Sequence, residues 1–262
     1  MGLPSCEPEH KRLRYPTRRL LGIRVDDLDQ GQVLQASEHA VRSGVPRQIV
    51  TINTEMLMKA RLDQELTACI ENAYLVVPDG IGLLLAGKLL SQPLRQRVAG
   101  SDLVPRLCQL AACRGFRPFF LGAGPGVASE AARRLACQLP GLRVAGAHSG
   151  SPQPEDLDAI LRLVHAASPD ILLVAYGVPA EEKWIARNLE QLAVPLTIGV
   201  GGSLDFVSGA VPRAPRRVQQ LGLEWLYRLY RQPWRWRRML ALPRFLALVL
   251  AEAFASRLTW HR

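Results

Sequence analysis

Polar residues that could bind or activate a substrate follow five separate apolar runs in this 262-residue chain. Thr51 and Asn53 close the run RQIVTIN, and Asp79 stands in the string PDG directly after the run AYLVV. Three later runs are followed by turns rich in glycine or acidic residues: GAGPG (122–126), YGVPAEEKW (176–184) and GVGGSLD (199–205). This recurrence favours one shared ligand cleft over five unrelated helix caps.

Asp79 is the candidate for acid–base chemistry. In the structural interpretation, Asp and Gly form a turn, and the Asp caps the helix that follows. In the chemical interpretation, the carboxylate faces a cleft and loses part of its hydration, so its pKa rises enough for it to act as a general base. Spacing alone leaves both interpretations open.

The two glycine-rich turns are candidate nucleotide sites. In GAGPG, backbone N–H groups could approach a phosphate at the start of a helix. The chain lacks the acidic residue about 20 positions later that a dinucleotide site needs, which argues against an NAD- or FAD-dependent oxidoreductase. In GVGGSLD, Gly201 and Gly202 either allow close helix–strand packing or form a wall for a base and ribose, with Asp205 accepting hydrogen bonds. Spacing does not separate these two interpretations.

Metal sites and cofactors are not predicted. The His, Cys and carboxylate residues lack metal-ligand spacing, and the string VDDLD (25–29) is better explained as a helix start. The five cysteines are an odd number with no secretory signal before them. They predict reduced thiols in a cytoplasmic protein.

A parallel sheet is needed to hold these polar turns at one edge. Apolar runs predict strands at 47–53, 73–78, 116–122, 142–148, 170–177 and 195–201. Helical patterns fill the gaps, near 28–43, 55–71, 81–90, 102–114, 126–138, 154–167 and 180–192. This alternation predicts an α/β fold with an open, mostly parallel, Rossmann-like sheet and helices on both faces. In such a sheet, ligands bind beyond the carboxyl ends of the strands, where the polar turns would lie.

The last fifth of the chain differs in composition. The net charge is +10, and residues 213–262 hold eleven Arg, no Lys and two Glu, which is +9 and leaves +1 for residues 1–212. Four of the five Trp also fall in the last fifth. We expect a loose tail at 1–20, an α/β catalytic domain at 21–212 and a basic amphipathic helical appendage at 213–262.

Arginines, tryptophans and an apolar stripe suit a helix that lies in the interface of an anionic membrane. The apolar run 244–254 is too short to span a bilayer, which needs about 20 residues. A charged helix packed on its own domain is the structural alternative. No RRM, KH or helix-turn-helix pattern accompanies the arginines, so a nucleic-acid partner is not expected.

Seven strings in sequence order resemble the WecG/TagA/CpsF family of bacterial glycosyltransferases, over about residues 20–240. They are TINTEM, VVPDGIGLLLAGKLL, RVAGSDL, LGAGPGVASEAARRL, YGVPAEEKW, GVGGSLDFVSGAVPRAP and EWLYRLYRQPWRWRR. The resemblance implies an inverting, metal-independent enzyme, peripheral on the inner face of the cytoplasmic membrane. It would transfer a hexose or N-acetylhexosamine, with N-acetylmannosamine the best match, from a UDP-sugar to an undecaprenyl-diphosphate-linked sugar. The product would serve cell-surface polysaccharide or teichoic acid assembly.

The resemblance also implies roles for single residues. Asp79 would be the base that takes the proton of the attacking acceptor hydroxyl, beside Thr51 and Asn53. The other residues would bind substrate: Arg97 the donor or its phosphates, Gly201, Gly202 and Asp205 the uridine, and Arg228, Arg235 and Arg238 of the appendage the diphosphate. Arginines suit that role because a departing UDP gains negative charge, which a guanidinium offsets with two hydrogen bonds.

One position departs from the family pattern. The family has Gln then Glu in the string that here reads YGVPAEEKW, where this chain has Glu181 and Glu182. An ionised Glu cannot donate a hydrogen bond, so the donor that Glu181 would contact is open. UDP-glucose, used in exopolysaccharide assembly, is an alternative donor. A non-catalytic, nucleotide-binding scaffold on the membrane surface is a second alternative, and a homo-oligomer is compatible with the sequence.

Overall fold

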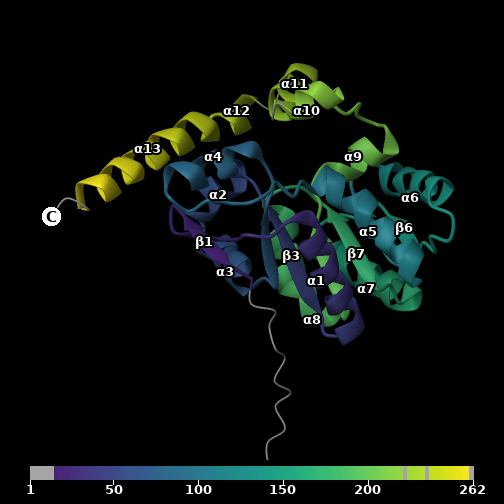
Figure 1. Cartoon of the computed structure of the whole chain (residues 1–262). Helices are drawn as coiled ribbons and strands as arrows, with labels where there is room; N and C mark the ends of the chain where they lie inside the picture. Colours follow the sequence, from purple (N-terminus) through teal and green to yellow (C-terminus); the bar gives the residue numbers. More distant parts are fainter. Residues whose placement is uncertain (1–14, 221–222, 234–235, 260–262) are drawn as a thin grey trace, which may run out of the picture.

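The computed structural model describes residues 15–220, 223–233 and 236–259. These described residues form a parallel sheet of six strands in the order β4-β3-β8-β7-β5-β6 (Figure 1). The strands are β3 (Arg47–Ile52), β4 (Leu75–Pro78), β5 (Pro118–Gly122), β6 (Gly146–His148), β7 (Ile171–Ala175) and β8 (Leu196–Gly199). The predicted α/β fold is confirmed, and each strand lies within its predicted run.

Helices cover both faces of the sheet (Figure 1). They are α1 (Gln30–Ser43), α2 (Thr54–Ala60), α3 (Gln64–Asn72), α4 (Ile81–Leu89), α5 (Gly100–Arg114), α6 (Val127–Gln138), α7 (Pro154–Ala167), α8 (Ala180–Leu192) and α9 (Ser203–Ser208). Ile49 and Leu173 share a hydrophobic cluster with residues of α1 and α5. Their chain neighbours Val50 and Leu172 belong to clusters with α2, α3, α7 and α8. Burial on both faces explains why the strands are apolar at nearly every position.

Side-chain caps set where α1, α2 and α3 begin. Asp29 accepts a hydrogen bond from the Gln32 N–H at 2.8 Å, which confirms that VDDLD starts a helix. The predicted helix at 55–71 is instead two helices, because Asp63 caps α3 by accepting from the Leu66 N–H at 3.1 Å. Asp63 is a residue type that caps helices, but the helical spacing of apolar residues continues on both sides of it, so the two helices were predicted as one.

A two-stranded antiparallel hairpin precedes the sheet and was not predicted. It consists of β1 (Thr17–Leu20) and β2 (Ile23–Asp26). Since β1 falls inside the predicted loose tail at 1–20, regular structure begins earlier than expected. The rest of that predicted tail, residues 1–14, lies outside the described residues.

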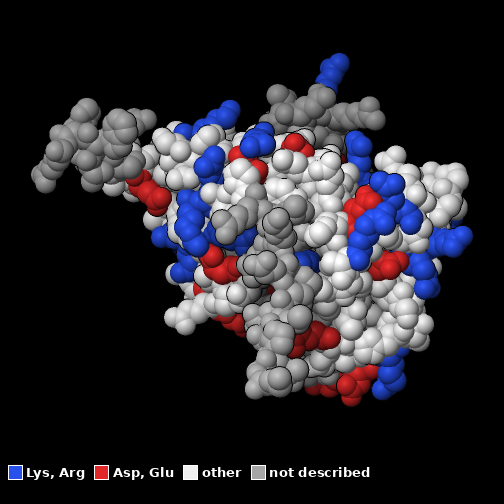
Figure 2. Space-filling view, turned by 60° about the horizontal axis from the view of Figure 1, so that its bottom comes forward, with Lys and Arg blue, Asp and Glu red and all other residues white. Residues whose placement is uncertain are grey.

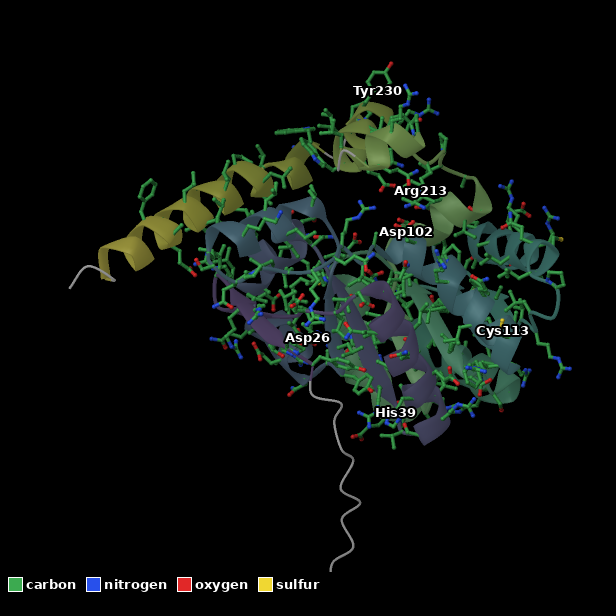
Figure 3. All side chains as sticks on the ribbon, viewed as in Figure 1. Asp26, His39, Asp102, Cys113, Arg213 and Tyr230 are labelled. Carbon is green, nitrogen blue, oxygen red and sulfur yellow. The ribbon has the colours of Figure 1, made fainter. Side chains whose placement is uncertain are left out.

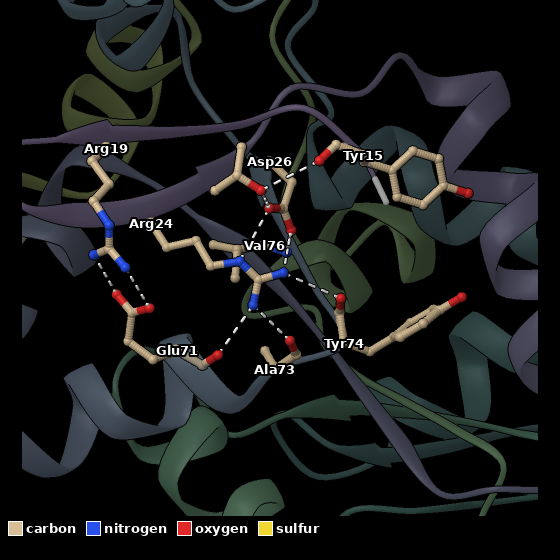
Figure 4. Close-up of polar contacts among 9 residues, drawn as sticks. Tyr15, Arg19, Arg24, Asp26, Glu71, Ala73, Tyr74 and Val76 are labelled. Carbon is tan, nitrogen blue, oxygen red and sulfur yellow. Dashed lines mark hydrogen bonds and ion pairs between the residues drawn. The ribbon is translucent and has the colours of Figure 1, made fainter. Parts of the chain in front are cut away.

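The hairpin covers the edge strand β4. Asp26 Oδ2 accepts a hydrogen bond from the Val76 N–H at 2.9 Å, and Arg24 donates to the Ala73 carbonyl at 2.9 Å (Figure 4). Backbone groups on an edge strand otherwise lack partners and invite pairing with another chain. The hairpin therefore covers the β4 edge through side chains, while remaining a separate two-stranded sheet.

The C-terminal segment is helical, as predicted, and contains α10 (Arg216–Gln220), α11 (Glu224–Arg231), α12 (Trp236–Met239) and α13 (Ala241–Thr259). α10 and α11 lie above the carboxyl ends of the strands, and α13 runs back along α2 and α4 (Figure 1). Phe245 and Val249 of α13 are buried in the same cluster as the hairpin. α13 is thus part of the core of the α/β body.

Exposed apolar side chains gather on the C-terminal helices. They include Trp225, Leu226, Tyr230, Trp236, Leu240, Leu246, Leu250 and Phe254. Within the described residues, no helix has both the length and the apolar character to cross a bilayer. Basic and acidic side chains are interspersed on the face shown in Figure 2, in agreement with the near-neutral composition of residues 1–212.

Candidate active site

Asp79 lies at the carboxyl end of β4, just before α4. Gly80, with a φ of 136°, is the N-cap residue of α4, so Asp79 does not have the capping role considered above. The Asp79 N–H donates to the Ile52 carbonyl at 2.6 Å, which continues the ladder between β4 and β3. Its carboxylate faces the start of α5, where the Gly100 N–H approaches Oδ2 at 3.5 Å.

The surroundings of Asp79 raise its pKa from 3.8 to about 6. Desolvation is the largest cause, and the negative charges of Glu224 and Asp102 act in the same direction. The positive charge of Arg97 and the Gly100 N–H oppose them. A carboxylate with this pKa is ionised at neutral pH and still basic enough to accept a proton, as a general base must be.

Thr51 and Asn53 lie at the end of the neighbouring strand, and both have structural contacts. The Thr51 hydroxyl is buried and donates to the Gly199 carbonyl on β8 at 3.1 Å. Asn53 caps α2, because its Oδ1 accepts a hydrogen bond from the Met56 N–H at 2.9 Å. That cap uses only the carbonyl oxygen, so the side-chain NH₂ of Asn53 can still donate to a ligand.

Arg97 lies close enough to Asp79 to lower its pKa, and two carboxylates flank it. Arg97 Nη2 lies 3.5 Å from Asp102 Oδ2 on α5, and Nη1 lies 3.6 Å from Glu224 Oε2 on α11. Arg213 pairs with the same carboxylates, at 2.7 Å to Asp102 and 3.2 Å to Glu224. Figure 3 shows Asp102 and Arg213 facing each other beneath α10 and α11.

Glu181 is buried at the start of α8. Its Oε2 accepts hydrogen bonds from the N–H of Gly177 at 2.9 Å and of Gly201 at 3.1 Å. The carboxylate therefore joins the turn after β7 to the turn after β8. Its neighbour Glu182 is also buried, and desolvation, with the charge of Glu181 adding to it, raises the Glu182 pKa well above 4.5.

The turn GVGGSLD places Gly201, Gly202 and Asp205 at the start of α9. Gly201 has a φ of 51°, a conformation that favours glycine, and Gly202 is the N-cap residue of α9, with Asp205 in the first turn. The packing interpretation holds for Gly199, where a Cβ would collide with the Glu182 carboxylate. In this turn, glycine is therefore required at Gly199 for lack of space and favoured at Gly201 by the backbone conformation.

The GAGPG turn lies at the same edge of the sheet and opens α6. Gly126 is the N-cap residue of α6, with a φ of 76°, and its N–H donates to Ser149 Oγ at 3.3 Å. Gly122, with a φ of 97°, packs against the carbonyl of Ala175 on β7, which leaves no space for a side chain. The start of α6 thus presents helix N–H groups beyond the strand ends, as the nucleotide interpretation requires.

The appendage arginines fall largely outside the described part of the chain. Arg235 lies outside the described residues, and so do the side chains of Arg228 on α11 and Arg238 on α12. Sequence reasoning did not single out the residues that meet Arg97 from the appendage side. Glu224 is a first-turn acid of α11, and Arg213 stands in a loop, so neither has a local signal beyond its charge.

The described residues contain no group of three or more His, Cys, Asp or Glu side chains that could hold a metal ion. The two carboxylates near Asp79 are paired with arginines instead, Asp102 with Arg97 and Arg213, and Glu224 with the same two. Metal independence itself stays a prediction.

Comparisons with known proteins point to one family. The sequence model described as "Glycosyl transferase WecG/TagA/CpsF family" matches residues 18–259. A Bacillus spizizenii protein named N-acetylglucosaminyldiphosphoundecaprenol N-acetyl-beta-D-mannosaminyltransferase is 36% identical over 208 residues, which are 79% of this chain and 80% of that protein. A Bacillus subtilis protein of the same name is 33% identical over 215 residues, 82% of this chain and 83% of that protein.

Proposed function

Since the chain belongs to the WecG/TagA/CpsF family of glycosyltransferases, we propose that it transfers N-acetylmannosamine from a UDP-sugar to undecaprenyl-diphosphate-linked N-acetylglucosamine. The names of both relatives give this acceptor and this transferred sugar. The observation that carries the proposal is Asp79, a carboxylate with a pKa of about 6 at the carboxyl edge of the sheet that does not cap a helix. The product enters cell-surface polysaccharide or teichoic acid assembly.

The reaction is a single displacement at the anomeric carbon of the donor sugar. The acceptor hydroxyl oxygen forms a bond to that carbon while Asp79 takes the hydroxyl proton. The bond from the carbon to the UDP oxygen breaks, and UDP leaves with the electron pair. Because the acceptor attacks from the face opposite UDP, the configuration at the carbon is inverted.

The departing UDP gains negative charge, which the site must stabilise. Arg97 supports this role because it lies beside Asp79 and has a guanidinium fork that fits phosphate. We expect Arg228, Arg235 and Arg238 to add positive charge, since α11 lies over the strand ends. With this cluster the transfer needs no metal ion.

The uridine is proposed to occupy the turn that contains Gly201, Gly202 and Asp205. Glu181 braces this turn through the Gly201 N–H. The UDP-glucose alternative depended on Glu181 contacting the sugar, whereas its Oε2 is bonded to two backbone N–H groups. The names of the two relatives favour N-acetylmannosamine as the donor sugar.

The protein is proposed to work on the inner face of the cytoplasmic membrane, where a lipid-linked acceptor resides. The exposed Leu246, Leu250 and Phe254 of α13 and the exposed Arg244 support this location. Deleting 213–262 would also uncover the core that Phe245 and Val249 fill, so point substitutions are the cleaner test. Leu246→Ser with Phe254→Ser should weaken binding to vesicles that contain anionic lipid while the fold is retained.

A panel of UDP-sugars with a short-chain lipid-diphosphate acceptor tests the activity. We expect transfer from UDP-N-acetylmannosamine in the presence of a chelator, and a profile of kcat/KM that falls below pH about 6 as Asp79 becomes protonated. Transfer from UDP-glucose alone would replace the donor assignment. UDP binding without transfer from any donor would favour the non-catalytic scaffold.

A further inference from the structure

A closed ring of four charges joins the C-terminal helices to the catalytic edge of the sheet. It runs from Arg97 to Asp102, to Arg213, to Glu224 and back to Arg97. Arg97 and Asp102 belong to the α/β body, whereas Arg213 and Glu224 come from the segment after α9; Figure 3 labels Asp102 and Arg213. Each carboxylate lies between two guanidinium groups, so the signs alternate around the ring.

The two arginines of the ring are held differently. Arg213 lies 2.7 Å from Asp102 and 3.2 Å from Glu224. Burial would lower the Arg213 pKa, but these two carboxylates outweigh burial and raise it. Arg97 lies 3.5 and 3.6 Å from the same residues, beyond the roughly 2.8 Å of a good charged hydrogen bond. Arg213 is therefore the anchor, and Arg97 keeps capacity to bind another anion.

We propose that Glu224 and Asp102 are positioning residues for Arg97, anchored by Arg213, so that Arg97 presents its N–H groups to the diphosphate of the donor. This inference rests on the proposed function. Because Glu224 is carried by α11, docking of the C-terminal helices and orientation of Arg97 are coupled. A diphosphate can approach Arg97 with two oxygens at hydrogen-bond distance, which neither carboxylate of the ring does.

The contact between Glu224 and Arg97 is shielded enough from water for the loss of Glu224 to be measurable. The side chains of Glu224 and Arg97 are 16% and 22% exposed, so water screens their interaction less than it screens a surface pair. The ring also acts on Asp79. The groups that face its carboxylate are Arg97, Asp102, Glu224 and the Gly100 N–H, and Glu224 is one of the two charges that raise the Asp79 pKa.

Glu224→Gln is the direct test, by steady-state kinetics with UDP-N-acetylmannosamine and the lipid acceptor. Because Arg97 loses its orientation, the KM for the donor should rise roughly tenfold, with a smaller fall in kcat. Removing the negative charge also lowers the Asp79 pKa, so the acidic limb of the kcat/KM profile should move to lower pH. A role for Glu224 that does not depend on its charge would leave both the KM and that limb unchanged.

Glu65→Gln is the matched control. Glu65 also pairs with two cations, Lys183 at 3.1 Å and Arg187 at 2.6 Å, but on α3 and α8. The KM for the donor and the pH profile of kcat/KM of Glu65→Gln should equal those of the parent. Arg213→Lys is a second variant of the ring: it keeps the charge but loses the planar fork that meets both carboxylates, and it should raise the KM as Glu224→Gln does.

If the parent is active and Glu224→Gln has the same KM for the donor and the same acidic limb of the kcat/KM profile, the inference is wrong and the proposed function stands. If the parent binds UDP but transfers no sugar, the proposed function fails. The inference is then tested by measuring UDP affinity by calorimetry. Glu224→Gln should then bind UDP roughly tenfold more weakly than the parent, and equal affinity would refute the positioning role. A parent that does not bind UDP would refute both.

Discussion

Arg24 at the covered edge of the sheet and Arg97 at its carboxyl end differ in how fully their N–H groups are used. Arg24 donates to both oxygens of Asp26, at 3.1 and 2.8 Å (Figure 4). It also donates to the backbone carbonyls of Glu71, Ala73 and Tyr74. Within the described residues, Arg97 has ion-pair contacts of 3.5 and 3.6 Å with two carboxylates.

The nearby aspartates show the same difference. Asp26 accepts from the Thr17 hydroxyl at 2.9 Å, from the Val76 N–H at 2.9 Å and from Arg24. Asp79 accepts a single long hydrogen bond of 3.5 Å within the described part of the chain. Buried polar groups are normally satisfied. The Arg24–Asp26 pair, whose polar groups all have partners, therefore stabilises the fold. For Arg97 and Asp79, which have few and long contacts, we expect a ligand to supply further partners.

The largest expected effect is on catalysis by Asp79→Asn. The amide cannot take the hydroxyl proton, so kcat should fall roughly 10²- to 10⁴-fold, while calorimetry should show UDP affinity close to that of the parent. Asp158→Asn, at an exposed position on α7, is the control and should keep full activity. Undiminished transfer by Asp79→Asn would remove Asp79 from the mechanism.

Arg24→Met should lower the free energy of unfolding by about 3 kcal/mol, because it leaves the buried Asp26 carboxylate without its cation. Urea denaturation measures this loss. Arg42→Met is the control, since the Arg42 side chain is 59% exposed in its pair with Glu38, and the loss there should be below about 1 kcal/mol. Equal losses in the free energy of unfolding for the two variants would mean that the many hydrogen bonds of Arg24 add nothing to stability.

Arg97→Met should reduce activity with little loss of stability, whereas Arg24→Met should reduce stability. Removing the guanidinium beside the departing diphosphate should lower kcat/KM roughly 10²-fold. The free energy of unfolding should change by less than about 1 kcal/mol, because the contacts of Arg97 are long. A loss of stability as large as that of Arg24→Met, with activity retained, would contradict the comparison.

The smallest expected effect is a gain in stability from Asp79→Asn. The folded-state pKa of Asp79, about 6, lies above its unfolded value of 3.8, so ionising the group destabilises the folded state as pH rises between these values. Asn does not ionise, and the variant should be about 1 kcal/mol more stable at pH 7.5, after a discount for partial exposure. Urea denaturation should show the gain shrinking toward pH 4, and a gain that is independent of pH would have another cause.

Local signals predicted much of this protein. Apolar runs located the strands, and the position of Asp79 directly after one of them placed it at the carboxyl edge of the sheet. The hairpin was missed because Ile23 and Val25 form too short an apolar run to stand out. Asn53 has the cap that its residue type predicts, whereas Asp79 does not, and only the backbone conformation of Gly80 separates these two cases.

The sequence by itself determined the α/β alternation, the basic helical segment and the family, because periodic burial and motif order depend on residues close together in the chain. Tertiary structure alone decided which charges meet. Gln48 bonds Glu182 across 134 positions, and Glu224 reaches Arg97 only because α11 lies over the strand ends. Ion pairs and hydrogen bonds are short-ranged and directional, so residue type shows that a group needs a partner but not which partner folding brings to it.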